Sequence, residues 1–210
     1  MIQQLMIFGS SFVIALSGAM VPGPLLTVTI SESARRGAMT GPLLIVGHGI
    51  LELLLLIAIM MGLAPFLSRD SVFIATAIAG GCFLGWLSFS MFRDLPSLNI
   101  ATNTTNSSER NLVFSGALMS LANPFWIVWW ATIGIGYIVY ASGFGVWGVF
   151  SFFTGHILAD LAWYAFVSAA ISKGRHVLND NIYRWLIGIC ATLLMIFAAF
   201  FIITGIQKFL

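Results

Sequence analysis

The chain alternates between long apolar stretches and short polar loops. Residues 1–31, 71–92 and 185–207 contain no Asp, Glu, Lys or Arg. A helix that crosses a bilayer needs roughly 20 mostly apolar residues, so each of these stretches predicts one crossing. Residues 38–67 predict a fourth crossing, because Glu52 is the one charged residue within them.

Residues 111–159 also lack these four residue types, and they are too many for a single crossing. They hold one crossing and most of another, which continues past Asp160. A turn at Ser142, Gly143 and Gly145 separates the two. The hydrophobic pattern therefore predicts an all-α membrane protein with six transmembrane helices.

The composition excludes most other classes of protein. Hydrophobic residues make up 60% of the chain, charged residues 8%, and the mean hydropathy is +1.01. A soluble domain of 210 residues could not bury so much apolar surface. The net charge of +2 is spread over short loops, so no nucleic acid is expected as a partner. The pattern GxxxxGKS or GxxxxGKT is absent, and we expect no ATP hydrolysis by this chain, no cofactor and no enzymatic activity.

The basic residues favour one side of the membrane. Lys and Arg are enriched in cytoplasmic loops. One set of loops carries only Arg69 and Lys208. The other set carries Arg35, Arg36, Arg93, Arg110, Lys173, Arg175 and Arg184. This asymmetry predicts a multi-pass protein of the cytoplasmic membrane with both termini outside the cytoplasm.

The two halves of the chain share a pattern of residues. His48 and Glu52 recur as His156 and Asp160 at one offset, since 156 − 48 = 160 − 52 = 108. Such self-similarity is typical of transporters built from internal repeats.

The polar stretch at residues 93–110 is predicted to connect these halves. Residues 1–92 form the first three-helix repeat and residues 111–210 the second. Because three crossings is an odd number, the second repeat enters the membrane upside down relative to the first. The sequence therefore predicts a 3+3 inverted repeat with its substrate site near the midplane.

Prolines interrupt the first helix of each half. Pro22, Gly23 and Pro24 follow one another in the first stretch, and Asn123 precedes Pro124 in the fourth helix. Proline removes an amide donor and clashes with the preceding turn, so we expect helices 1 and 4 to be broken at these sites. A pair of simple kinks is the alternative.

Each break would start a new helix whose first amides are free. Pro24 suits the first position of such a helix, and Asn123 is a natural N-cap. Free amides and the positive end of the helix dipole favour a carboxylate. The predicted substrate-binding residues are Pro22, Gly23, Pro24, Leu25, Asn123, Pro124 and Phe125.

Two ionisable pairs interrupt otherwise apolar helices. His48 and Glu52 are four residues apart, as are His156 and Asp160, so each pair shares one helix face. A charge near the middle of the bilayer costs at least ~2.5 kcal/mol, and such residues mark functional sites. We predict that the pairs bind and release protons or contact a substrate amino group. Neutral structural pairs are the alternative.

The same four residues support a second hypothesis. Imidazole and carboxylate groups together suit several divalent transition metals. His48, Glu52, His156 and Asp160 would then bind such an ion, and the chain would export it.

Nearby aromatic residues have two interpretations. Each one alone is best explained as an anchor at the membrane interface, but together they would floor a cavity. They are Trp126, Trp129, Trp130, Trp163 and Tyr164.

The order and spacing of several motifs resemble the LysE family of amino-acid exporters. The motifs are LSGAMVPGP at residues 16–24, RRGAMTG at 35–41 and GALMSLANP at 116–124, with Arg184, Trp185 and Gly188 near the start of the last helix. The resemblance covers nearly the whole chain. It implies six helices, an inner-membrane location and proton-driven efflux of amino acids or similar small metabolites.

The resemblance also implies roles for single residues. Pro22, Gly23, Pro24, Asn123 and Pro124 would form the two helix breaks of the family, and Glu52 and Asp160 its acidic positions. His48 and His156 lie outside that pattern. The sequence thus predicts a secondary transporter, a proton antiporter, that exports amino acids or similar small zwitterionic metabolites, with a divalent transition-metal exporter as the alternative. Its expected partners are an amino-acid substrate, protons and membrane lipid, and a homodimer is compatible with the sequence.

Overall fold

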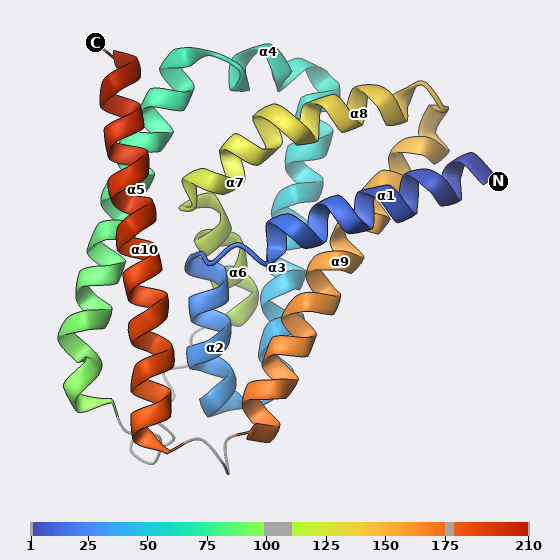
Figure 1. Cartoon of the computed structure of the whole chain (residues 1–210). Coiled ribbons are helices and arrows are strands. Elements are labelled where there is room, and N and C mark those ends of the chain that lie inside the picture. The colour runs from blue at the N-terminus through green and yellow to red at the C-terminus, as the bar shows by residue number, and fades with distance from the viewer. Residues whose placement is uncertain (1, 99–110, 175–178, 210) are drawn as a thin grey trace.

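The protein is all-helical in the computed structural model, which describes residues 2–98, 111–174 and 179–209 (Figure 1). No strand occurs within these ranges. The α-helices are α1 (Ile2–Ala19), α2 (Pro24–Arg36), α3 (Thr40–Ala58), α4 (Ala64–Leu67), α5 (Asp70–Asp94), α6 (Leu112–Leu121), α7 (Pro124–Trp129), α8 (Ile135–Ser142), α9 (Gly145–Gly174) and α10 (Asp180–Phe209). Two short π-helical segments, Ile59–Leu63 and Trp130–Gly134, join α3 to α4 and α7 to α8.

Six helical segments of the described chain are long and apolar enough to cross a bilayer, as the sequence predicts. They are Ile2–Ala19, Thr40–Leu67, Asp70–Ser97, Pro124–Ser142, Gly145–Gly174 and Asp180–Phe209. The protein is therefore a multi-pass membrane protein.

The chain leaves the helical path twice near the middle of the molecule (Figure 1). α1 ends at Ala19, and α2 begins at Pro24, after a non-helical segment of four residues. Gly23 is extended there, with φ −147° and ψ −179°. α6 ends at Leu121, and α7 begins at Pro124. In both places a proline occupies the first turn of the next helix, where its missing amide hydrogen breaks no helical bond.

Three pairs of helices make the main long-range contacts. α5 packs along α10, α1 along α9, and α3 along α6. Glycines allow the backbones to touch in two of these pairs, because a Cβ on Gly47 would collide with the Val113 carbonyl and one on Gly155 would approach the Phe8 carbonyl. These contacts bring α3 and α9 together in the centre of the protein.

Part of the predicted connecting loop is helical. α5 continues through Asp94 and is followed by a 3₁₀ turn at Leu95–Ser97. Residues 99–110 of the predicted loop, including Arg110, lie outside the described residues, as does Arg175. The ends of α2, α5 and α9 and the start of α10 gather at one end of the molecule (Figure 1).

Candidate functional site

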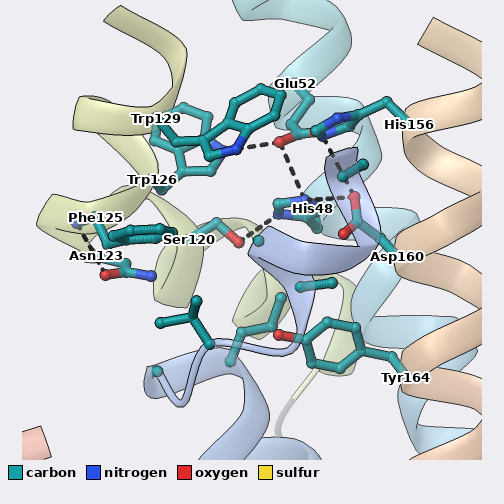
Figure 2. Close-up of a pocket in the computed structure, with 16 residues that line it drawn as sticks. His48, Glu52, Ser120, Asn123, Phe125, Trp126, Trp129, His156, Asp160 and Tyr164 are labelled. Carbon is teal, nitrogen blue, oxygen red and sulfur yellow. Dashed lines mark hydrogen bonds and ion pairs between the residues drawn. The ribbon is translucent and has the colours of Figure 1, made fainter. Parts of the chain in front are cut away.

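A cavity opens where the α1–α2 break faces α3, α7 and α9 (Figure 2). Its volume is about 70 Å³. Eight of the residues predicted from the sequence line it, namely Gly23, Leu25, His48, Glu52, Asn123, Phe125, His156 and Asp160. The structure thus brings the residues of both helix breaks and both ionisable pairs to one site.

The four ionisable residues form one cluster rather than two separate pairs. His48 Nε2 lies 3.1 Å from Glu52 Oε1 and 3.5 Å from Asp160 Oδ2. His156 Nε2 lies 3.0 Å from Glu52 Oε2 and 3.4 Å from Asp160 Oδ2. Each histidine therefore contacts both carboxylates, and all four side chains are buried. We call these four residues the tetrad.

Two indoles hold the Glu52 carboxylate. Trp126 Nε1 and Trp130 Nε1 each donate a hydrogen bond of 2.9 Å to Glu52 Oε1. Hydrogen bonds to an ionised acceptor are stronger than neutral ones, so the two indoles would fix the position of a Glu52 carboxylate. Because the indoles and both imidazoles surround it, Glu52 is the central group of the tetrad.

A serine orients the ring of His48. Ser120 Oγ donates to the Gly116 carbonyl at 2.8 Å and lies 2.7 Å from His48 Nδ1. A hydroxyl has one hydrogen to donate, and Ser120 gives it to Gly116. Both bonds therefore form together when His48 Nδ1 carries the proton and donates it to Ser120, which leaves Nε2 facing the carboxylates.

Some tetrad atoms have no hydrogen-bond partner among the described residues. They are Glu52 Oε2, His156 Nδ1 and Asp160 Oδ2, each buried. Glu52 Oε2 and Asp160 Oδ2 lie within 3.5 Å of imidazole nitrogens, but without the geometry of a hydrogen bond. Ion-pair contacts to the imidazoles hold these oxygens, and each oxygen keeps a lone pair that can accept from a further ligand.

The two helix starts differ in what they offer to an anion. Asn123 Oδ1 accepts from the Phe125 amide at 3.1 Å, so Asn123 is the N-cap of α7 and that amide is already used. No described side chain caps the start of α2 at Gly23. The Asn123 Nδ2 group lies 3.2 Å from the position of a Cβ on Gly23, which places this amide beside the α2 terminus. The start of α2, which no described side chain caps, and Asn123 Nδ2 can therefore offer amide hydrogens to an anion in the cavity.

Three predicted site residues lie beside the cavity rather than in its lining. Pro22 and Pro24 line a smaller neighbouring cavity. Pro124 packs against Gly80, where a Cβ would meet the proline ring. These prolines shape the breaks, whereas Gly23 and Asn123 face the cavity.

The structure also adds residues to the predicted site. Trp126 and Trp129 line the cavity and are buried, so for these two the cavity interpretation holds and the interfacial anchor interpretation is wrong. Tyr164 lines it from α9. Ser120 was not identified from the sequence, because a single serine in an apolar helix carries no distinguishing pattern.

The arrangement suits a ligand with charges of both signs. The tetrad offers carboxylate oxygens, and the α2 terminus with Asn123 offers amide hydrogens, within the same cavity. A buried polar site between membrane helices is the architecture of a transporter.

Comparison with known proteins agrees with this class. A family model described as LysE type translocator matches residues 16–205, and the chain belongs to that family. The protein is thus a membrane translocator. The expected resemblance to this family is confirmed.

Two known proteins are similar to this chain. "Chemotactic transduction protein ChpE" of Pseudomonas aeruginosa is 32% identical over 146 residues, which cover 67% of this chain and 71% of the relative. "Putative amino acid efflux protein YcgF" of Bacillus subtilis is 24% identical over 206 residues, which cover 97% of this chain and 99% of the relative. No solved structure matches the chain.

Proposed function

We propose that the protein is a secondary transporter that exports amino acids or similar small zwitterionic metabolites across the cytoplasmic membrane in exchange for protons. The observation that carries this proposal is the shared cavity, in which the uncapped start of α2 and the tetrad face one ligand space. The similarity to a relative named for amino acid efflux supports it.

The substrate carboxylate is assigned to the α2 terminus. Backbone amides at Leu25 and the helix dipole attract an anion there, and Asn123 Nδ2 supplies a side-chain donor. Phe125 lines the cavity next to Asn123 and gives an apolar wall. Pro22, Pro24 and Pro124 hold the two breaks that make this space.

The substrate amino group is assigned to Asp160. Glu52 Oε2 and Asp160 Oδ2 both lack a hydrogen-bond partner among the described residues, but two indoles already hold the Glu52 carboxylate at Oε1. An ammonium group offers three donors to such an oxygen. The remaining members, His48, His156 and Glu52, carry the transported proton, because imidazole changes charge in the physiological pH range.

The proposed transport cycle relies on an inverted repeat. The helix contacts support it, because α1 of the first half packs on α9 of the second, and α6 of the second packs on α3 of the first. Gly47 and Gly155, 155 − 47 = 108 positions apart, sit at matching places in these two contacts. Two such halves rocking about the central cavity provide alternating access.

The proposed orientation places both termini outside the cytoplasm. The ends of α2, α5 and α9 that carry Arg36, Arg93 and Lys173 lie together at one end of the molecule (Figure 1). Lys and Arg are enriched on the cytoplasmic side, so this end faces the cytoplasm.

Export of a divalent metal ion as the cargo is the weaker alternative. It uses the tetrad but gives no role to the α2 terminus, whose free amides repel a cation. The amino-acid proposal uses both ends of the cavity.

The test is substrate flux in sealed vesicles that contain the purified protein. A panel of labelled amino acids is offered with and without a pH gradient, beside vesicles that contain the Asp160→Asn variant. We expect a pH gradient to accelerate flux of one or a few compact amino acids, and Asp160→Asn to abolish it. Flux of no zwitterion in the panel, or flux that Asp160→Asn leaves intact, would contradict the proposal.

A further inference from the structure

We infer that the tetrad is a binding site for a divalent transition-metal ion, with Zn²⁺ the best match. This inference concerns binding to His48, Glu52, His156 and Asp160 in the purified chain without substrate, because a bound ion would occupy the groups that the proposed function gives to the substrate amino group and the proton. It rests on the convergence of their donor atoms, on the hydrogen bonding of His48, and on the unsatisfied buried oxygens.

The donor atoms of the tetrad converge on one point. Taking one ligand atom from each residue, all four lie within 4.8 Å of one another. The four nitrogen–oxygen contacts, in which His48 meets Glu52 Oε1 and His156 meets Glu52 Oε2, are 3.1, 3.5, 3.0 and 3.4 Å long. A tetrahedral ion with ligands at about 2.0–2.2 Å separates its ligands by roughly 3.3–3.6 Å. These contacts are close to that spacing, and a bound ion would draw the wider pairs of donor atoms together.

The nitrogen that His48 offers is fixed by Ser120. Because Ser120 gives its hydrogen to the Gly116 carbonyl, His48 Nδ1 is the donor in their 2.7 Å contact. The ring then turns Nε2 toward the two carboxylates, where a proton or a metal ion can lie between nitrogen and oxygen. An outer hydrogen bond from the second ring nitrogen is the usual support of a metal-bound histidine.

The carboxylates supply the third argument. Glu52 is 1% exposed and Asp160 5%, yet Glu52 Oε2 and Asp160 Oδ2 have no hydrogen-bond partner among the described residues. Asp160 Oδ2 points between the two imidazole nitrogens, toward the centre of the tetrad (Figure 2). Two ionised carboxylates with two neutral imidazoles would carry a charge of −2, which one divalent ion balances.

The mixture of ligands determines the kind of ion. Imidazole nitrogens suit Zn²⁺ and its transition-metal neighbours, whereas Mg²⁺ and Ca²⁺ prefer oxygen ligands alone. The four residues line one side of the cavity, so an ion in the cavity can reach them. We therefore expect Zn²⁺ and Co²⁺ to bind and Mg²⁺ and Ca²⁺ not to bind.

The experiment measures metal binding to the full chain, purified in detergent without a polyhistidine tag and freed of metal with a chelator. After equilibrium dialysis against Zn²⁺, elemental analysis is expected to find one ion per chain. His156→Gln is expected to lose it, and Asp94→Asn, a change at an exposed carboxylate beside Arg93, is expected to retain it. Bound Zn²⁺ well below one ion per chain, or equal binding by His156→Gln, overturns the inference.

Two further measurements guard against a variant that fails to fold. Ser120→Ala keeps every ligand but frees the His48 ring, and loss of such an outer partner is expected to weaken Zn²⁺ binding about 10–100-fold. Unchanged affinity in a folded Ser120→Ala protein contradicts the assigned role of Ser120. Co²⁺ bound to the unaltered protein is expected to show the intense visible absorption of a tetrahedral complex. A weak spectrum like that of hydrated Co²⁺ would overturn the inference, and this measurement requires no variant.

Discussion

Glu52 on α3 and His156 on α9 lie 3.0 Å apart, between Oε2 and Nε2, although they come from opposite halves of the chain. This contact is shorter than the 3.4 Å between His156 and Asp160, its neighbour one turn along the same helix. The two halves thus meet through ionisable groups in the protein centre. A change of charge on Glu52 therefore acts directly on its contacts with both α3 and α9.

Asn123 is expected to affect both stability and transport. Asn123→Ala removes the cap of α7, which typically destabilises by about 1 kcal/mol, and it also removes the donor beside the α2 terminus. Asn111→Ala is the matched control, because Asn111 caps α6 through the Val113 and Phe114 amides and lies outside the cavity lining. We expect similar losses of thermal stability in the two variants, but a raised KM for substrate flux only in Asn123→Ala. An equal KM in both variants would show that Asn123 does not bind the substrate.

The two indoles that hold Glu52 are expected to be coupled. Trp126→Phe and Trp130→Phe each remove one donor to Glu52 Oε1, and a hydrogen bond to a charged group contributes about 1.5–3 kcal/mol. Because the two indoles share one acceptor, their effects should not be additive: the stability loss of the double variant should differ from the sum of the two single losses. Thermal unfolding in detergent measures this, with the exposed Trp147→Phe as the control. Additive losses equal to that of the control would show that the indoles do not support Glu52.

Close helix contact at glycine is expected to be required for folding. A Cβ on Gly47 would collide with the Val113 carbonyl, so Gly47→Ala should separate α3 from α6 at a cost of about 1–3 kcal/mol or more. Gly136→Ala is the control, because nothing lies within 4 Å of a Cβ there. Yield of monodisperse protein after purification and its melting temperature report the difference. Equal stability of the two variants would show that α3 and α6 are not in backbone contact.

Much of the fold follows from the apolar pattern. Bilayer thickness sets the length of a crossing, so gaps between charged residues located all six candidate spans. The positions of Pro24 and Asn123 at helix starts also follow from local rules, because proline lacks an amide hydrogen and Asn accepts from a backbone amide. Such rules act within a few residues and need no knowledge of the packing.

The tetrad could be predicted only in part. The spacing of four residues placed His48 beside Glu52, but the contact of Glu52 with His156 depends on which faces of α3 and α9 meet. That choice is made by packing between distant segments, which one sequence does not reveal. For the same reason, Ser120 and the indole donors Trp126 and Trp130 were not linked to the tetrad from the sequence.

Proton movement coupled to substrate movement is the most direct test of the proposed export. The purified protein is reconstituted in sealed vesicles that contain a pH-sensitive dye, with no pH gradient, and an amino acid that it transports is added outside. We predict a change of internal pH that depends on the amino acid, is abolished in Glu52→Gln, and persists in Asp94→Asn. Amino-acid flux without any change of internal pH, or a change that Glu52→Gln leaves intact, would contradict proton exchange at the tetrad.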